Sequence, residues 1–148
     1  MFRFLKQSDI QKQFKLITMN IYTLISGLLA AFATIGHLTI GKKQFLKPML
    51  NADFDNLSKK VMHSVFHYIT VFLALSAVVL LMVGARGSGC MFEPTLFLGF
   101  IAANYFLFAI FQIVISLMAK ISLLKMFQWI FWLLIAVFAT GGICTAGC

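Results

Sequence analysis

Four long stretches of the chain contain no Asp, Glu, Lys or Arg, and this absence of charge constrains the fold more than any other feature. The uncharged stretches are residues 16–40, 61–83, 95–119 and 126–143. A bilayer core of roughly 30 Å is crossed by about 20 helical residues, so each stretch is long enough to span it. Every charged residue falls before or between the stretches, as the cost of placing charge in hydrocarbon requires.

The composition also favours a membrane protein over a soluble one. Hydrophobic residues make up 61% of the chain and charged residues only 11%, whereas about a quarter of the residues in soluble domains are charged. The apolar runs are continuous and lack the period-two alternation of transmembrane β-strands. We therefore expect an all-α fold, in which residues 1–148 form one integral membrane domain with four helices in an up-down-up-down bundle.

Two segments outside the expected helices mix apolar residues with basic ones. Residues 2–14 and residues 44–57 both have this composition, so we expect each to lie in the membrane interface. A short polar side chain before the second helix satisfies its free N–H groups, and Asp53, Asp55 and Ser58 are the candidates for this cap.

The orientation in the membrane follows from the positive residues near the helix ends. The first and third loops lie on the same side and share the lysines Lys42, Lys43, Lys47, Lys59, Lys60, Lys120 and Lys125. Positive residues favour the cytoplasm, so these lysines place the long loop 41–60 inside, whereas the basic tail before the first helix favours the reverse. Lysines beside helices are expected to contact anionic lipid headgroups and not nucleic acid.

The three histidines are the best candidates for a functional site. His37 lies near the end of the first expected helix, and His63 and His67 lie near the start of the second. Since these two helices are antiparallel, all three histidines reach the same membrane face. His63 and His67 are four residues apart and share one side of a helix. Neutral imidazole binds Zn, Cu and Fe, so this set predicts a metal site.

A second version of the site uses His37 and His67 as the axial ligands of a haem. It requires the two helices to separate beyond the usual packing distance, because the haem must fit between them. A third reading involves no ligand: the histidines lie at the headgroup level or form hydrogen bonds across helices. Thr70, Gln112 and Asn104 are the polar residues expected to support the site.

Small residues follow the histidines along both helices. The first helix has Ser26, Ala30, Ala33, His37 and Gly41 in one stripe, and the second has His63, His67, Thr70, Ala74 and Ala77. Small residues at this spacing allow two helices to approach closely in lipid. We therefore expect the histidines to face the interior of the bundle.

The three cysteines all fall on the side away from the long loop. Cys90 is able to pair with Cys144 or Cys148 only in an oxidising compartment. The alternative is that all three are free, small residues near helix ends. No C-x-x-C motif is present, so disulfide exchange is not indicated.

The region from Gly36 to Thr70 carries three motifs in order. They are G-H-L-T-I-G, K-P-M-L and V-F-H-Y-I-T. This order resembles small four-helix bacterial membrane proteins of uncharacterised function, in which H-L-x-x-G is followed by P-x-L and by an aromatic residue with H-x-x-T. The matching residues are His37, Gly41, Pro48, Leu50, His67 and Thr70, with Phe66 as the aromatic residue. The resemblance implies a helical bundle of the bacterial inner (cytoplasmic) membrane and a shared histidine pair, but no activity.

Together these observations predict a small membrane protein that binds a metal or haem at its histidines. A hydrolytic enzyme is less expected, because no Ser, His and Asp set lies within the bundle. A small proton-coupled antiporter is also less expected, because the membrane stretches contain no carboxylate. The alternative is a structural subunit without a cofactor, which belongs to a larger membrane complex or a homo-oligomer. A membrane redox enzyme with its cofactor at the histidines is the third possibility.

Overall fold

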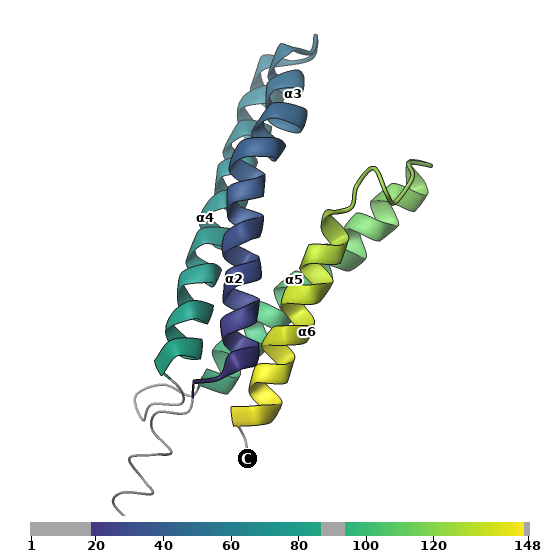
Figure 1. The fold of residues 1–148 in the computed structure, drawn as a ribbon. Coiled ribbons are helices and arrows are strands. Elements are labelled where there is room, and N and C mark those ends of the chain that lie inside the picture. Colours follow the sequence, from purple (N-terminus) through teal and green to yellow (C-terminus); the bar gives the residue numbers. More distant parts are fainter. Residues whose placement is uncertain (1–18, 87–93, 147–148) are drawn as a thin grey trace, which may run out of the picture.

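The computed structural model describes residues 19–86 and 94–146, and all regular elements in this part of the chain are helices (Figure 1). Its elements are α2 (Ile21–Gly36), the π-helix η1 (His37–Leu46), α3 (Lys47–Asn51), α4 (Asn56–Arg86), α5 (Pro94–Met118) and α6 (Gln128–Ala146). Four stretches are long and apolar enough to cross a membrane, namely Ile21–Asn51, Asn56–Ala85, Thr95–Met118 and Gln128–Thr145. The all-α prediction is therefore confirmed for the described residues.

The first helical stretch runs well past its predicted end at residue 40. α2, η1 and α3 follow one another without a break, and residues 52–55 then turn into α4. Residues 44–51, which we expected in a separate segment, thus continue the first helix. Pro48 is tolerated because it lies in the first turn of α3, where the hydrogen-bond pattern changes from that of a π-helix. The other expected interfacial segment, 2–14, lies outside the described residues.

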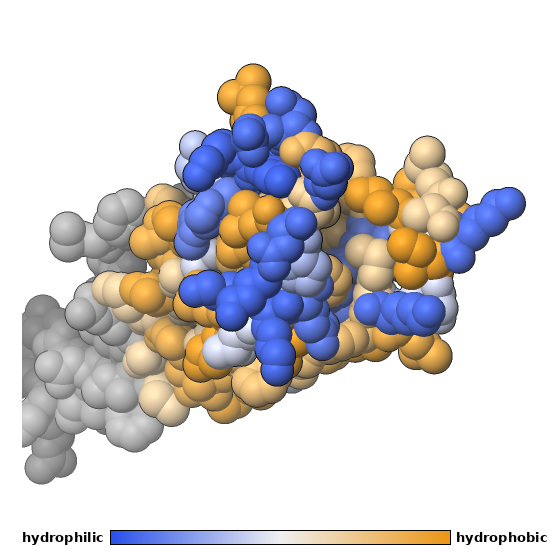
Figure 2. Space-filling model, turned by 90° about the horizontal axis from the view of Figure 1, so that it is seen from above, coloured by the Kyte–Doolittle hydropathy of each residue, from blue (hydrophilic) through white to orange (hydrophobic). Residues whose placement is uncertain are grey.

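The helices form two hairpins, α2 with α4 and α5 with α6, and α2 also packs against α6. Figure 1 shows that the hairpins lie together at one end and separate toward the other. We call the first the closed end; it contains Asn20, Gly84 and Thr145. The second, the open end, contains the turn 52–55 and the connection 119–127. Hydrophilic residues gather on the open end (Figure 2), where the lysines predicted to share one side are found.

At the closed end the helix backbones approach closely because glycines leave room. A Cβ atom on Gly84 would lie 2.7 Å from the backbone nitrogen of Leu24, and one on Gly27 would lie 2.8 Å from that of Leu81. Real Cβ atoms do not come this close to backbone, so only glycine fits at these two positions. The glycines therefore set the distance between α2 and α4.

Asn20 adds hydrogen bonds between three helices at the same end. Its side-chain oxygen accepts from the N–H of Thr23 at 3.1 Å and caps α2, while its side-chain nitrogen donates to the Gly142 carbonyl of α6 at 2.8 Å. Its backbone N–H donates to the Gly84 carbonyl at 3.0 Å. One residue thus joins the ends of α2, α4 and α6.

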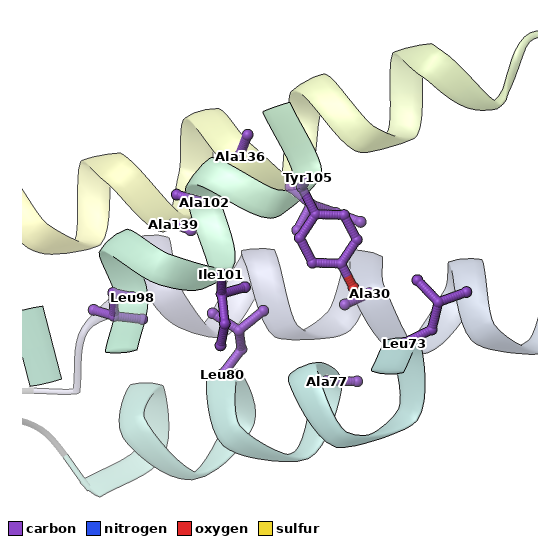
Figure 3. Packing of buried hydrophobic residues seen from close by; sticks show 11 residues of the cluster. Ala30, Leu73, Ala77, Leu80, Leu98, Ile101, Ala102, Tyr105, Ala136 and Ala139 are labelled. Carbon is purple, nitrogen blue, oxygen red and sulfur yellow. The ribbon is translucent and has the colours of Figure 1, made fainter. Parts of the chain in front are cut away.

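The core between the hairpins is built from alanines, leucines and isoleucines around one tyrosine (Figure 3). Tyr105 of α5 is fully buried, and its hydroxyl lies 2.6 Å from the hydroxyl oxygen of Ser76 on α4. Ring contacts with Phe72 and Trp132, each at 5.8 Å between centroids, surround it. The cluster members are Ala30, Leu73, Ala77, Leu80, Leu98, Ile101, Ala102, Tyr105, Ile135, Ala136 and Ala139.

Candidate metal centre

His63 and His67 form a close pair on α4, toward the open end. Their Nε2 atoms are 3.1 Å apart, and the ring centroids are 4.9 Å apart. This distance suits a hydrogen bond between two neutral imidazoles. It is also close to the separation of about 3.3 Å between two nitrogens that share one tetrahedral zinc at bonds of about 2.0 Å. The i, i+4 spacing therefore brings both ring nitrogens to one point without a change of backbone.

His37 has a different role, because it packs between α2 and α4. It is the first residue of η1, and its ring stacks on Phe66 at 4.1 Å between centroids. Its Nε2 lies 3.2 Å from the Phe66 carbonyl oxygen, which only accepts, so Nε2 carries the proton in this bond. Gly41 lies beside the ring, and a Cβ atom there would lie at an ordinary contact distance of 3.5 Å from His37 Nδ1. Thr70 donates its hydroxyl to the same carbonyl at 2.9 Å.

The three histidines are neighbours, but the described residues do not assemble them into one ligand set. The rings of His37 and His67 both contact the ring of Phe66. Within residues 19–86 and 94–146, however, no group of three or more His, Cys, Asp or Glu side chains is arranged to hold a metal ion. The structure thus brings His63 and His67 together, and it bonds His37 to the α4 backbone.

The pair lies on the side of α4 that faces away from α5. α4 contacts α5 through Phe72 and Ser76, and at about 100° per residue His63 and His67 point roughly the opposite way. His63 is half-buried, and both His67 and Ala74 are exposed. The prediction that the histidines face the interior of the bundle is wrong for His67, and Ala74 of the same stripe is exposed as well. The ring of Phe66, stacked on His37, occupies that interface instead.

Gln112 and Asn104, which were predicted to support the histidines, have their hydrogen bonds within the α5–α6 hairpin. The Gln112 side-chain nitrogen donates to Gln128 at 2.7 Å, and its oxygen accepts from the Trp132 ring N–H at 2.8 Å. Asn104 donates to the Phe100 carbonyl in its own helix at 2.8 Å. Thr70 is thus the predicted supporting residue that contacts the histidine region.

Two polar features were not identified from the sequence: the Asn20 contacts and the Ser76–Tyr105 bond. A polar residue directly before an apolar helical run is a capping signal, and this signal points to Asn20. No comparable signal pairs Ser76 with Tyr105, because the pairing depends on how two helices are rotated. Of the cysteines, Cys144 is exposed on α6, while Cys90 and Cys148 lie outside the described residues.

Comparisons of the chain with protein-family models, curated proteins and solved structures found no match. The resemblance to small four-helix bacterial membrane proteins stays a prediction. Function must therefore be argued from the chemistry of the site and not from the fold.

Proposed function

We propose that the protein is an integral membrane protein of up-down-up-down topology that binds a divalent transition metal at His63 and His67. Four helical stretches of membrane length support the membrane part of the proposal. The lysines at the open end support a single membrane boundary at that end. The closeness of the two Nε2 atoms, 3.1 Å, is the observation that supports metal binding.

Helix length puts the pair at the membrane surface. The stretch Ile21–Asn51 has 31 residues and measures about 45 Å at 1.5 Å per residue, which exceeds a bilayer core of roughly 30 Å. About 20 residues counted back from Ala85 end at Phe66. His63 and His67 then lie at the boundary, where hydrated metal ions have access, and the hairpin beyond them carries lysines into the headgroup region.

We further propose that the open end faces the cytoplasm of a bacterium. The lysines of both connections lie there and meet anionic headgroups of the inner leaflet. The bacterial inner membrane is the location that the sequence resemblance implies. Metal binding at this end would draw on the cytoplasmic pool of Zn, Cu or Fe.

The geometry favours the metal version of the site over the haem version. A haem ligated by His37 through Nε2 requires that nitrogen to leave the Phe66 carbonyl and the ring to leave the Phe66 stack. His63 and His67 need no such rearrangement, because only the proton between their Nε2 atoms has to move, to Nδ1 of the same ring, which leaves both imidazoles neutral. The pair is also accessible, since His67 is exposed.

Zinc binding by the purified, chelator-treated protein tests the proposal. We expect stoichiometric zinc by elemental analysis and an affinity that falls by about tenfold or more in His63→Ala and in His67→Ala. His37→Gln is the matched control, because its amide still donates to the Phe66 carbonyl and zinc binding is retained. Absence of stoichiometric zinc, or a zinc affinity that both alanine variants leave unchanged from the parent protein, would contradict the proposal. A Soret band that His37→Gln abolishes would support haem instead.

A further inference from the structure

We propose that the metal at His63 and His67 is shared by two copies of the chain, each of which supplies both imidazoles. The copies pack through the side of α4 that faces away from α5. This inference rests on the proposed function, because it concerns the composition of the same site. It adds a partner, a second copy of this chain, and a ligand set of four histidines.

The first argument is the number of ligands. Structural zinc sites are almost always four-coordinate, whereas one chain offers two nitrogens at this point. In the part of the chain that the structure describes, no third His, Cys, Asp or Glu side chain is arranged with the pair to hold a metal ion. Two copies related by a two-fold axis bring two identical pairs together, and the four nitrogens complete a tetrahedron.

The second argument is the surface around the pair. Val71 and Val78 are 56% and 51% exposed on the same side of α4, and Ala74 and Ala85 are exposed between and below them. This outward face combines small and β-branched residues, which allow close helix approach in lipid and lose little side-chain entropy on packing. α2 and α5 contact other sides of α4, so the outward face is open to another helix.

The third argument is membrane geometry. Both copies of a membrane protein insert in the same orientation, so a two-fold axis relating them runs along the membrane normal. Under that symmetry, each residue of one copy lies at the same depth as its equivalent in the other. The two His63–His67 pairs therefore meet at one level near the open end, while the valines and alanines of the outward face pack below them.

Zinc stoichiometry and particle mass, measured together on the full chain in mild detergent, test the sharing. We expect one zinc per two chains, a dimer mass with zinc, and a monomer mass after chelation or in the His63→Ala/His67→Ala double variant. Cobalt gives a second readout, because tetrahedral nitrogen coordination has intense visible absorption that six-coordinate hydrated cobalt lacks.

A bulky side chain on the outward face separates packing from ligation. Ala74→Phe leaves both histidines in place, so we expect loss of the dimer and about tenfold or more weaker zinc binding. Ala103→Phe is the matched control, since Ala103 is also an exposed alanine but lies on α5; this variant should behave like the unmodified chain.

The possible outcomes distinguish the two proposals. One zinc per chain at monomer mass would overturn the sharing and leave the proposed function intact. No stoichiometric zinc in any form would overturn the proposed function itself. A dimer that persists in the double histidine variant, or that Ala74→Phe leaves unchanged, would overturn the inference, because association would then not depend on the site.

Discussion

The closed end and the open end are held together by different means. At the closed end, Gly27 and Gly84 bring the backbones of α2 and α4 into contact, and Asn20 bonds to α4 and α6. At the open end, each hairpin keeps its own contacts: His37 with Phe66 in one, Gln112 with Trp132 in the other. The closed end is thus fixed by backbone approach, and the open end by side chains that are partly accessible.

This difference matters because lipid tails are as apolar as leucine. Helix association in a membrane depends on close packing and hydrogen bonds rather than on removing apolar surface from water. The closed end has both, in the close backbone approach at Gly27 and Gly84 and in the hydrogen bonds of Asn20. The open end carries the lysines and the exposed His67, the groups on which the proposed metal site depends. The closest backbone contacts and the proposed site therefore lie at different levels along the molecule.

The largest loss of stability is expected from a substitution where the backbones of α2 and α4 touch. Gly84→Ala places a methyl group 2.7 Å from the Leu24 nitrogen, and relief requires the whole of α2 to move. We expect unfolding to become easier by about 3 kcal/mol, at the upper end of typical overpacking costs. Thermal unfolding in detergent, followed by tryptophan fluorescence and circular dichroism, measures the loss.

Gly36→Ala is the control for this substitution. Gly36 is also helical, but a Cβ atom there meets nothing within 4 Å, so alanine should stabilise the helix by about 0.5–1 kcal/mol. Equal destabilisation by the two variants would show that helix propensity, and not the α2–α4 contact, determines the result. It would remove the distinction between a tightly packed closed end and the rest of the chain.

A smaller loss of stability is expected when the buried hydroxyl between the hairpins is removed. Tyr105→Phe removes the bond to Ser76, whose hydroxyl keeps its second partner, the Leu73 carbonyl at 3.0 Å. No buried group is left unpaired, so we expect a loss of about 1 kcal/mol. Tyr68→Phe, at a tyrosine that is 69% exposed, should leave the unfolding temperature unchanged. A Tyr105→Phe variant as stable as its parent would mean that ring packing alone joins the hairpins.

At the open end, one substitution is expected to raise stability by about as much as Tyr105→Phe lowers it. Lys120 lies just beyond the end of α5 and has a left-handed backbone (φ 53°). The N–H groups of Lys120 and Ile121 donate back to the carbonyls of Leu117 and Ser116. Glycine adopts this conformation without strain, so Lys120→Gly should stabilise the protein by about 1 kcal/mol. Lys120→Ala removes the same charge and keeps the strain. Equal unfolding temperatures for the two variants would contradict the explanation.

The helices were predictable from the sequence because the cost of charge in hydrocarbon is large and local. Uncharged stretches located all four membrane-length helices. Their ends were less predictable: lysines stop a membrane span but not a helix, so the first helical stretch continues through Lys42 and Lys43 to Asn51. The π-helix that begins at His37 had no recognisable signal in the residues alone.

The candidate site was predictable only in part, for a related reason. Spacing along one helix is fixed by its geometry, so the approach of His63 to His67 follows from the sequence. The rotation of one helix against another is not fixed in this way, because small residues occur on several sides of α4. For that reason the stacking of His37 on Phe66, and the outward position of His67, required the structure.

The smallest and most local effect concerns the turn at the open end, where one of the predicted caps is confirmed. Asp55 accepts from the Ser58 backbone N–H at 2.9 Å and from its hydroxyl at 3.1 Å. These bonds, the backbone one first, hold the pKa of Asp55 below its usual value of 3.8. The cap therefore contributes fully above pH 3.8, and its contribution is lost as pH falls through the lower, folded pKa.

Hydrogen exchange at the start of α4 should reveal this loss. Below pH 3.8, we expect the backbone amides in the first turn of α4 to exchange faster in the parent protein than in the Asp55→Asn variant. The reason is that asparagine caps a helix without titrating. The glycine-held closed end should keep its protection in both proteins over the same range. Asp53→Asn is the control for a neighbouring carboxylate. If it removes the pH dependence as well as Asp55→Asn does, the cap is not the cause. If amide protection is lost at the closed end together with the turn, the two ends unfold as one unit. The closed end is then not independently more stable than the open end.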